Sequence, residues 1–278
     1  MYDTALSTFN NCRRSYRLEE NWPPRANELA DFVSYLSYKQ FSPSTVKSYI
    51  SGISYFCKLH NLQDPTQSFL LRKILVGLSR KYLRTDDRKP ITPDILSSLL
   101  RLLPAICKSP YESKLFSAMF TTAFFGYFRM GELVQNTVLD PGHAIQVEYV
   151  TYHEHSDTVQ IFLKHSKTDQ EGKGTIITLS STQRPPCPVH TMRSFICLRP
   201  KIPGAFFCPE SRKPVTRYQV TSVFNMALDK LGLDTRVYKT HSFRIGVAYS
   251  TWAMGTSKLD IAQRGRWKSH CMFNYIRE

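Results

Sequence analysis

The last forty residues of the chain hold side chains that together could attack a phosphodiester. His241 and Arg244 are three residues apart, so on a helix both project from one face. Arg presents a planar fork of donors that suits two phosphate oxygens. Trp267 follows between two basic residues, and Tyr275, a hydroxyl nucleophile, lies eight positions beyond it. An Arg, a His and a Tyr beside a bound phosphate can form a phosphotyrosyl ester without a metal ion.

A second charged pair lies in an apolar stretch near the middle of the chain. Arg129 sits inside FFGYFRMGEL, where a charge is costly unless it has a partner. Glu132, three residues on, could lie on the same helical face and orient it. On these residues alone, a structural ion pair and a catalytic Arg with its orienting acid are equally good interpretations.

The segment HSFRIG and the later GRWKSHCMFNYI resemble the carboxy-terminal box of tyrosine recombinases. That box is His-x-x-Arg, then a His or Trp, then the Tyr, and all positions are filled in order. The form with Trp resembles the versions in eukaryotic DIRS-like and Crypton-like mobile elements. The phrase SPSTVKSYISGISYF resembles the helical core-binding domain that precedes recombinase catalytic domains.

The resemblance assigns roles to particular residues. It implies that Lys167, in the polar turn SKTDQEGKG, protonates the leaving 5′-oxygen from a β-hairpin. Without it, Lys164 and Lys173 would be equal candidates. The catalytic residues that it implies are Arg129, Glu132, Lys167, His241, Arg244, Trp267 and Tyr275. It also implies four protomers on two duplexes, a homotetramer, although the chain ends three residues after Tyr275, where many family members carry an assembly segment.

Composition agrees with a nucleic-acid partner. The 278 residues carry a formal net charge of +15, which favours a polyanion, double-stranded DNA first and an acidic membrane second. No apolar run reaches spanning length, and the amino terminus lacks the apolar region of a signal peptide. We therefore expect an intracellular protein, nuclear if the host is eukaryotic, with no membrane partner. The seven scattered cysteines fit reduced thiols.

The chain reads as two domains with a polar link near Arg88. We expect a helical DNA-binding domain at 1–88, and a catalytic domain at 89–278 that is mostly α with a small antiparallel β-sheet. Helices are predicted at 2–18, 26–40, 43–62, 64–84, 94–103 and, as one long segment, 111–134. Strands are predicted at 144–154, 158–167 and 174–180. Two later helices are predicted, one beginning at Thr216 or Ser222 and the other at Thr240 or Ser242. The second would place His241 at a helix N-terminus, where backbone amides favour an anion.

Basic side chains could clamp a duplex, although each taken singly is better read as part of a solvated face. In 64–84 an apolar stripe of Phe69, Leu70, Ile74 and Leu78 lies opposite cations. The DNA-contact candidates are Lys47, Arg72, Lys73, Arg80, Lys81, Lys164, Lys173, Arg217 and Arg266.

Other interpretations weigh less. Cys187, His190, Cys197 and Cys208 carry zinc donors, but paired Cys-x-x-Cys knuckles are absent, so we expect no metal and no cofactor. The alternatives to a recombinase are a type IB topoisomerase-like strand transferase, a domesticated non-catalytic DNA-binding protein, and a basic protein adaptor.

Overall fold

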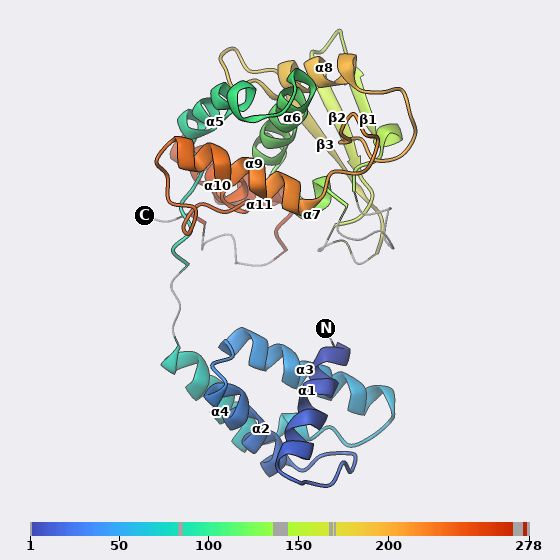
Figure 1. Cartoon of the computed structure of the whole chain (residues 1–278), viewed down its shortest axis with the longest axis vertical. Coiled ribbons are helices and arrows are strands. Elements are labelled where there is room, and N and C mark those ends of the chain that lie inside the picture. Colours follow the sequence, from blue (N-terminus) through green and yellow to red (C-terminus); the bar gives the residue numbers. More distant parts are fainter. Residues whose placement is uncertain are drawn as a thin grey trace. The chain divides into compact units, whose positions relative to one another are not determined.

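The computed structural model describes residues 2–82, 86–135, 144–166, 169, 171–268 and 275–276. The chain divides into two compact units, Met1–Thr85 and Asp86–Glu278 (Figure 1). The division falls three residues before Arg88, and each unit has its own hydrophobic core.

The amino-terminal unit is helical. Its elements are α1 (Tyr2–Ser15), α2 (Ala26–Tyr38), α3 (Pro43–Leu59), the 3-10 turn η1 (Pro65–Gln67) and α4 (Phe69–Lys81). Ser42 caps α3 as the sequence predicts, because its Oγ accepts from the Thr45 amide at 3.2 Å and Pro43 occupies the first turn. α1 packs on α3 and α2 packs on α4, which buries Phe9, Phe32 and Ile53.

One expectation for this unit is wrong. The segment 64–84 is not one helix, since Ser68 caps a new start and accepts from the Leu71 amide at 3.3 Å. With this start, Leu71 and Leu78 face the core, whereas Phe69 is 70% and Leu70 46% exposed. The predicted apolar stripe is therefore correct at Leu78 but wrong at Phe69 and Leu70. Near the carboxy-terminal end of α1, Arg13 is buried, bound to Glu28 at 2.5 Å and stacked on Phe9.

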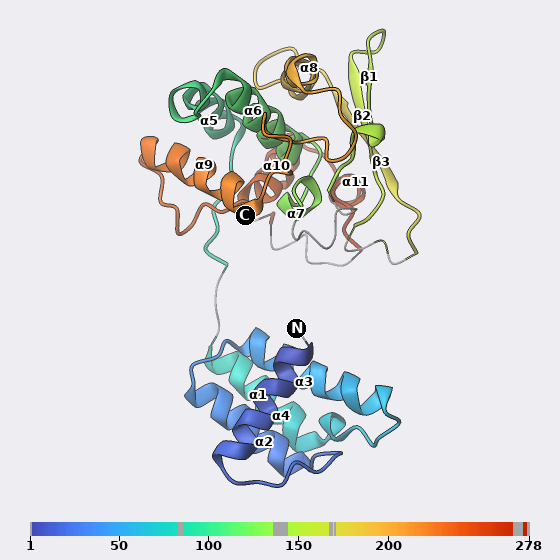
Figure 2. The same ribbon diagram turned by 45° about the vertical axis from the view of Figure 1, so that its right-hand side comes forward.

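The carboxy-terminal unit is mostly α with a small antiparallel sheet, as predicted. Its helices surround α6, which contacts α5, α8 and α10, while α8 also packs on β2 and β3 (Figure 2). The elements are α5 (Pro93–Ile106), α6 (Pro110–Phe125), α7 (Met130–Leu133), η3 (Val147–Tyr149), β1 (Val150–His153), β2 (Thr158–Leu163), β3 (Thr175–Ser180), α8 (Pro188–Leu198), α9 (Arg217–Lys230), α10 (Ser242–Ala253) and α11 (Lys258–Gly265).

The described sheet has the order β1-β2-β3 with both pairs antiparallel. Val150 lies opposite Ile161, which lies opposite Ile177. Alternation along β2 buries Val159, Ile161 and Leu163 on one face, where α8 covers them. The two strands of the β2–β3 hairpin are therefore fixed by their antiparallel pairing and by the packing of α8 against them.

The predicted single helix at 111–134 is interrupted. α6 ends at Phe125, Tyr127 has a φ of 52°, and α7 begins only after Arg129. A Cβ at position 126 would overlap the Phe128 ring, so the chain can turn back here only with Gly. The helix predicted at 94–103 runs further, because α5 ends at Ile106 and includes Pro104 in its last turn.

The segment before α5 lies along the start of α10. The Lys89 amide donates to the Val237 carbonyl at 2.9 Å, and the Ile91 amide donates to the Ser242 carbonyl at 3.0 Å. Gly246 of α10 lies directly against this backbone, because a Cβ there would overlap the Ile91 carbonyl. The residues just before Lys89 are thereby held beside the amino-terminal end of α10.

Candidate active site

His241 and Tyr275 lie against each other at the amino-terminal end of α10. The His241 Nε2 and the Tyr275 hydroxyl are 2.9 Å apart, and the ring centroids are 5.3 Å apart. Burial lowers the pKa of His241 to about 4, and the charges of Arg88, Arg244 and Arg129 lower it further. The ring is therefore neutral near pH 7, and with its proton on Nδ1 it accepts a hydrogen bond from the Tyr275 hydroxyl.

Arg129 and Glu132 form the expected pair, although not within one long helix. Arg129 is the N-cap of α7 and Glu132 is its third residue. The Glu132 carboxylate accepts from the Arg129 Nη1 at 2.9 Å and from the Arg129 backbone amide at 2.8 Å. The Arg129 side chain stays 25% exposed, whereas the Glu132 side chain is 8% exposed. Glu132 thus fixes a guanidinium that solvent, or a phosphate, can still reach.

Arg244 is buried in the centre of the site. Its Nη1 donates to the Tyr127 carbonyl and its Nη2 to the Gly265 carbonyl, while its guanidinium lies 4.3 Å from the Trp267 ring centroid. Burial and the charges of Arg129 and Arg266 lower the pKa of Arg244 to about 9, so it remains a cation near pH 7. Among the described residues its Nε has no hydrogen-bond partner. The side chain is held rigidly before any substrate binds.

Trp267 packs the wall of the site. Its ring lies 5.9 Å from that of Tyr127 and 5.6 Å from that of Tyr275, centroid to centroid. It also covers Gly265, where a Cβ would overlap the indole. Trp267 therefore packs against both the Tyr275 ring and the Arg244 guanidinium.

Arg266, predicted to contact DNA, is buried beneath the surface. Its side chain is only 8% exposed and donates to the Glu132 carboxylate and the Tyr127 carbonyl, each at 3.1 Å, and to the Gly126 carbonyl at 3.1 Å. The fold thus uses the Arg266 donors to hold Glu132 and the turn after α6, and a direct DNA contact by this residue stays a prediction.

Six of the seven predicted catalytic residues converge in this unit: Arg129, Glu132, His241, Arg244, Trp267 and Tyr275. Lys167 lies outside the described residues. In the same turn, the Asp169 carboxylate accepts from the Gly174 amide at 2.7 Å and from the Lys173 amide at 3.3 Å. Hydrogen bonds from backbone amides, that of Gly174 first, lower the pKa of Asp169, and the charge of Lys268 has a smaller effect. Asp169 thus holds the backbone at Gly174, directly before β3.

Arg88 and Asp86 lie near the site, although the sequence predicts only a domain boundary near Arg88. Arg88 donates from Nε and Nη2 to the two Asp86 carboxylate oxygens at 2.7 and 2.6 Å. Its charge is the largest influence on the pKa of His241 after burial. The only signal in the sequence is an Asp-x-Arg spacing, and the same spacing at Asp234 and Arg236 forms an exposed pair.

The remaining DNA-contact candidates are all exposed. In the amino-terminal unit, Lys47 and Arg72 line an open pocket between α3 and α4, together with Lys58. In the carboxy-terminal unit, Arg217 begins α9, and Lys173 pairs with Glu171 at 2.5 Å. The exposed set is Lys47, Arg72, Lys73, Arg80, Lys81, Lys164, Lys173 and Arg217.

Over the described residues, no three His, Cys, Asp or Glu side chains gather as metal ligands would, including the group around Cys187. Cys187 instead accepts from the His190 amide at 3.4 Å as the N-cap of α8. None of the described helices has the length and apolarity to cross a membrane.

Comparison with known proteins gives the fold. No family model matches the chain. An integrase/recombinase XerD homolog from Selenomonas ruminantium is 24% identical over 283 residues, covering 91% of this chain and 80% of that protein. The XerH site-specific recombinase, solved bound to its difH substrate before cleavage, superposes with a TM-score of 0.69 at 14% identity, over 100% of this chain and 75% of XerH. The chain has the tyrosine recombinase fold.

The Tn1549 transposon integrase, solved with circular intermediate DNA, has the same fold with a TM-score of 0.58. It is 12% identical and covers 92% of this chain and 82% of the solved integrase. The chain is thus similar in sequence to an integrase/recombinase and similar in fold to site-specific recombinases and a transposon integrase. The comparisons do not separate the branches of the tyrosine recombinase family.

Proposed function

We propose that this chain is a site-specific tyrosine recombinase or integrase that cleaves and rejoins double-stranded DNA. The observation that carries the proposal is the 2.9 Å contact between the Tyr275 hydroxyl and a neutral His241, inside a group of buried or fixed arginines. A hydroxyl nucleophile with an adjacent base is the arrangement that covalent catalysis requires. The likeness in fold to recombinases solved on DNA supports the same reading.

In the proposed cleavage, the Tyr275 oxygen attacks phosphorus while its proton passes to the His241 Nε2. The bond from phosphorus to the 5′-oxygen breaks, and that oxygen takes a proton from Lys167. The product is a 3′-phosphotyrosyl ester, which keeps the bond energy, so the reverse reaction rejoins the strand without ATP. Arg129 and Arg244 stabilise the charge that grows on the non-bridging oxygens, and the Trp267 indole N–H adds a donor.

Arg129 and Arg244 divide this work unequally. Arg129 is partly exposed and already oriented by Glu132, so it can bind an oxygen directly. Arg244 has both terminal nitrogens on backbone carbonyls, so it acts mainly as a fixed buried charge, with its Nε as the donor still available among the described contacts.

The exposed cations extend the proposal from the site to the duplex. Those of α3, α4, the β2–β3 hairpin and α9 would bind phosphates, which makes affinity fall steeply with salt. Recombination joins two duplexes, so we propose a homotetramer in the synaptic complex. We also propose a mobile-element origin within the DIRS-like or Crypton-like branch, supported by the Trp267 form of the box and by the likeness to a transposon integrase. In a eukaryotic host such a protein would act in the nucleus.

Two other functions share part of this evidence. A type IB topoisomerase-like strand transferase would use the same residues without synapsis, and would relax plasmids that lack any target site. A domesticated DNA-binding protein would keep the fold and the cations but would have no use for the Tyr275–His241 contact.

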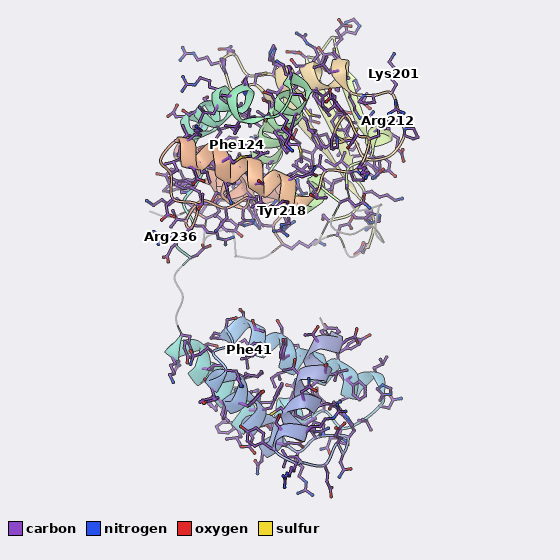
Figure 3. All side chains as sticks on the ribbon, in the orientation of Figure 1. Phe41, Phe124, Lys201, Arg212, Tyr218 and Arg236 are labelled. Atoms are coloured by element: carbon purple, nitrogen blue, oxygen red, sulfur yellow. The ribbon has the colours of Figure 1, made fainter. Side chains whose placement is uncertain are left out.

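The test is covalent trapping on the native flanking DNA, nicked near candidate sites so that the cleaved end diffuses away. Wild-type protein should give protein–DNA adducts on denaturing gels, and Tyr275→Phe should give none while binding DNA with unchanged affinity. Tyr218→Phe is the matched control, because Tyr218 is 82% exposed on α9 (Figure 3) and should leave adduct formation unchanged. Adducts that persist in Tyr275→Phe would disprove the nucleophile.

A further inference from the structure

Arg266 is held inside the carboxy-terminal unit by three bonds to segments far from it in the sequence. Its Nη1 donates to the Gly126 carbonyl, and its Nη2 donates to the Tyr127 carbonyl and the Glu132 carboxylate, each at 3.1 Å. The Arg266 and Glu132 side chains are each 8% exposed. A guanidinium presents its donors in a planar fork, so these three acceptors set the direction of its plane as well as its place. Arg266 is thereby tied to the turn after α6 and to α7.

Glu132 links Arg266 to Arg129. The Glu132 Oε1 accepts from the Arg129 Nη1 at 2.9 Å, whereas its Oε2 accepts from the Arg129 backbone amide at 2.8 Å and from Arg266. The carboxylate therefore lies between two guanidinium groups, one buried and one 25% exposed. Because Arg266 binds the oxygen that does not contact the Arg129 guanidinium, it restricts rotation of the carboxylate. The orientation of the exposed cation thus depends on the buried one.

The Tyr127 carbonyl is a second link, because it accepts from both Arg266 and Arg244. The turn that presents this carbonyl is itself fixed, since the Tyr127 hydroxyl lies 2.9 Å from the Thr251 hydroxyl of α10. Arg266 ends α11, and the next residue, Trp267, has its ring centroid 4.3 Å from the Arg244 guanidinium. Arg266 therefore contacts the groups that support both arginines of the site.

We propose that Arg266 is a positioning residue, which through Glu132 holds Arg129 in the orientation that binds the scissile phosphate. This inference rests on the proposed function for its catalytic meaning. Both terminal nitrogens of Arg266 already donate to protein oxygens, and little of the side chain reaches the surface. Arg266 thus acts on the reaction through Arg129, whereas an exposed cation that binds a phosphate acts on DNA affinity.

The first part of the experiment needs no DNA. NMR of the full chain follows the Nε–H signal of Arg129, assigned with Arg129→Lys. Arg266→Met keeps an unbranched side chain but removes the donors, so it should shift and broaden this signal as the Glu132 carboxylate becomes free to rotate. Arg264→Met is the matched control and should leave the signal unchanged, because Arg264 is exposed in the last turn of α11, two residues before Arg266.

The second part uses the nicked substrate at saturating concentration. Arg266→Met should form adducts about 100-fold more slowly, since displacing a positioned group by about 1 Å has an effect of that order. DNA affinity and its slope with salt should stay unchanged, because no phosphate contact is lost. Arg264→Met should form adducts at the wild-type rate. In a Glu132→Gln background, Arg266→Met should slow adduct formation by no more than about twofold, because the link to Arg129 is already weakened.

An Arg129 signal that does not move in Arg266→Met would overturn the inference, and so would adduct formation at the wild-type rate. A weaker DNA affinity with a salt slope reduced by about one would show a direct phosphate contact instead. A full further loss in the Glu132→Gln background would show that Arg266 does not act through Glu132. Urea unfolding checks that each variant is folded, and Arg266→Lys, which keeps the buried charge but not the fork, should also shift the signal if Arg266→Met does not fold.

Failure of the proposed function gives a different result. Wild-type protein would then form no adduct, while the Arg129 signal would still move in Arg266→Met. Adducts that need Tyr275, together with an unmoved Arg129 signal, would leave the function standing and remove only the role of Arg266.

Discussion

Replacing Glu132 by Ala should unfold the carboxy-terminal unit more readily than any other single carboxylate change near the site. The Glu132 carboxylate accepts from Arg129 at 2.9 Å, from Arg266 at 3.1 Å and from the Arg129 backbone amide at 2.8 Å. Arg244 lies close enough that the Glu132 charge acts on its pKa. Without Glu132, three guanidinium groups lie together with no buried anion among these contacts.

The magnitude follows from what is left behind. Removing one partner of a buried ion pair costs about 3–5 kcal/mol, because the remaining charge stays desolvated. Loss of the capping box at the start of α7 adds about 1 kcal/mol. We therefore expect Glu132→Ala to lower the free energy of unfolding by about 5 kcal/mol, and Glu132→Gln, which keeps a carbonyl acceptor, by about 2 kcal/mol.

Urea unfolding in a Trp22→Phe background measures this loss. Trp22 lies in the amino-terminal unit, so the fluorescence of Trp252 and Trp267 then reports the carboxy-terminal unit alone. The midpoint should fall with an unchanged slope. A second change, Arg266→Met, should recover part of the loss in the Glu132→Ala background, because it removes one unpaired buried cation.

Asp260→Ala is the control for a carboxylate at the third position of a helix. Asp260 occupies that position in α11, is exposed, and accepts from the Ser257 hydroxyl at 2.7 Å. Its loss should cost about 1 kcal/mol or less. If Glu132→Ala costs no more than Asp260→Ala, then Glu132 does not hold the arginines of the site as argued.

Two further predictions concern stability. Because folding lowers the pKa of His241 from 6.5 to about 4, the unfolded chain binds the proton first as the pH falls. The contribution of neutral His241 to the free energy of unfolding is therefore fully present above its ordinary pKa of 6.5 and decreases as the pH falls below that value. The decrease is about 2 kcal/mol between about pH 7 and about pH 5. His241→Gln should therefore make the midpoint of urea unfolding depend less on pH. Gly246→Ala should cost about 3 kcal/mol in the same assay, because its Cβ meets the Ile91 backbone; a loss within about 0.5 kcal/mol of zero would contradict the close packing of α10.

The parts of this fold that are set locally could be predicted from the sequence. Ser42 followed by Pro43, and Thr216 before α9, act through the nearest backbone amides, and both caps form where their residues indicate. The Arg129–Glu132 pair is likewise within three residues. The convergence of the carboxy-terminal box on Arg129 came from the resemblance, since nothing local brings residues more than a hundred positions apart together.

The parts that failed depend on tertiary contacts. Helical periodicity cannot show whether Phe69 or Leu71 faces the core, because both lie in one apolar run and the choice follows from where Ser68 starts the helix. Arg88 carried no visible signal, since its place beside His241 comes from backbone bonds to a segment almost 150 residues away. Arg266 looked like a surface cation because a basic residue beside Trp267 gives no indication of a buried acceptor.

The missed break after α6 is what makes the site possible. In a continuous helix the carbonyls of Gly126 and Tyr127 would accept backbone amides four residues on. Because α6 ends at Phe125, the Tyr127 carbonyl instead accepts from both Arg244 and Arg266, and the Gly126 carbonyl accepts from Arg266. The same turn places Arg129 at the start of α7, where Glu132 can reach it. One interrupted helix therefore supplies the oxygens that hold two arginines and the N-cap that presents a third.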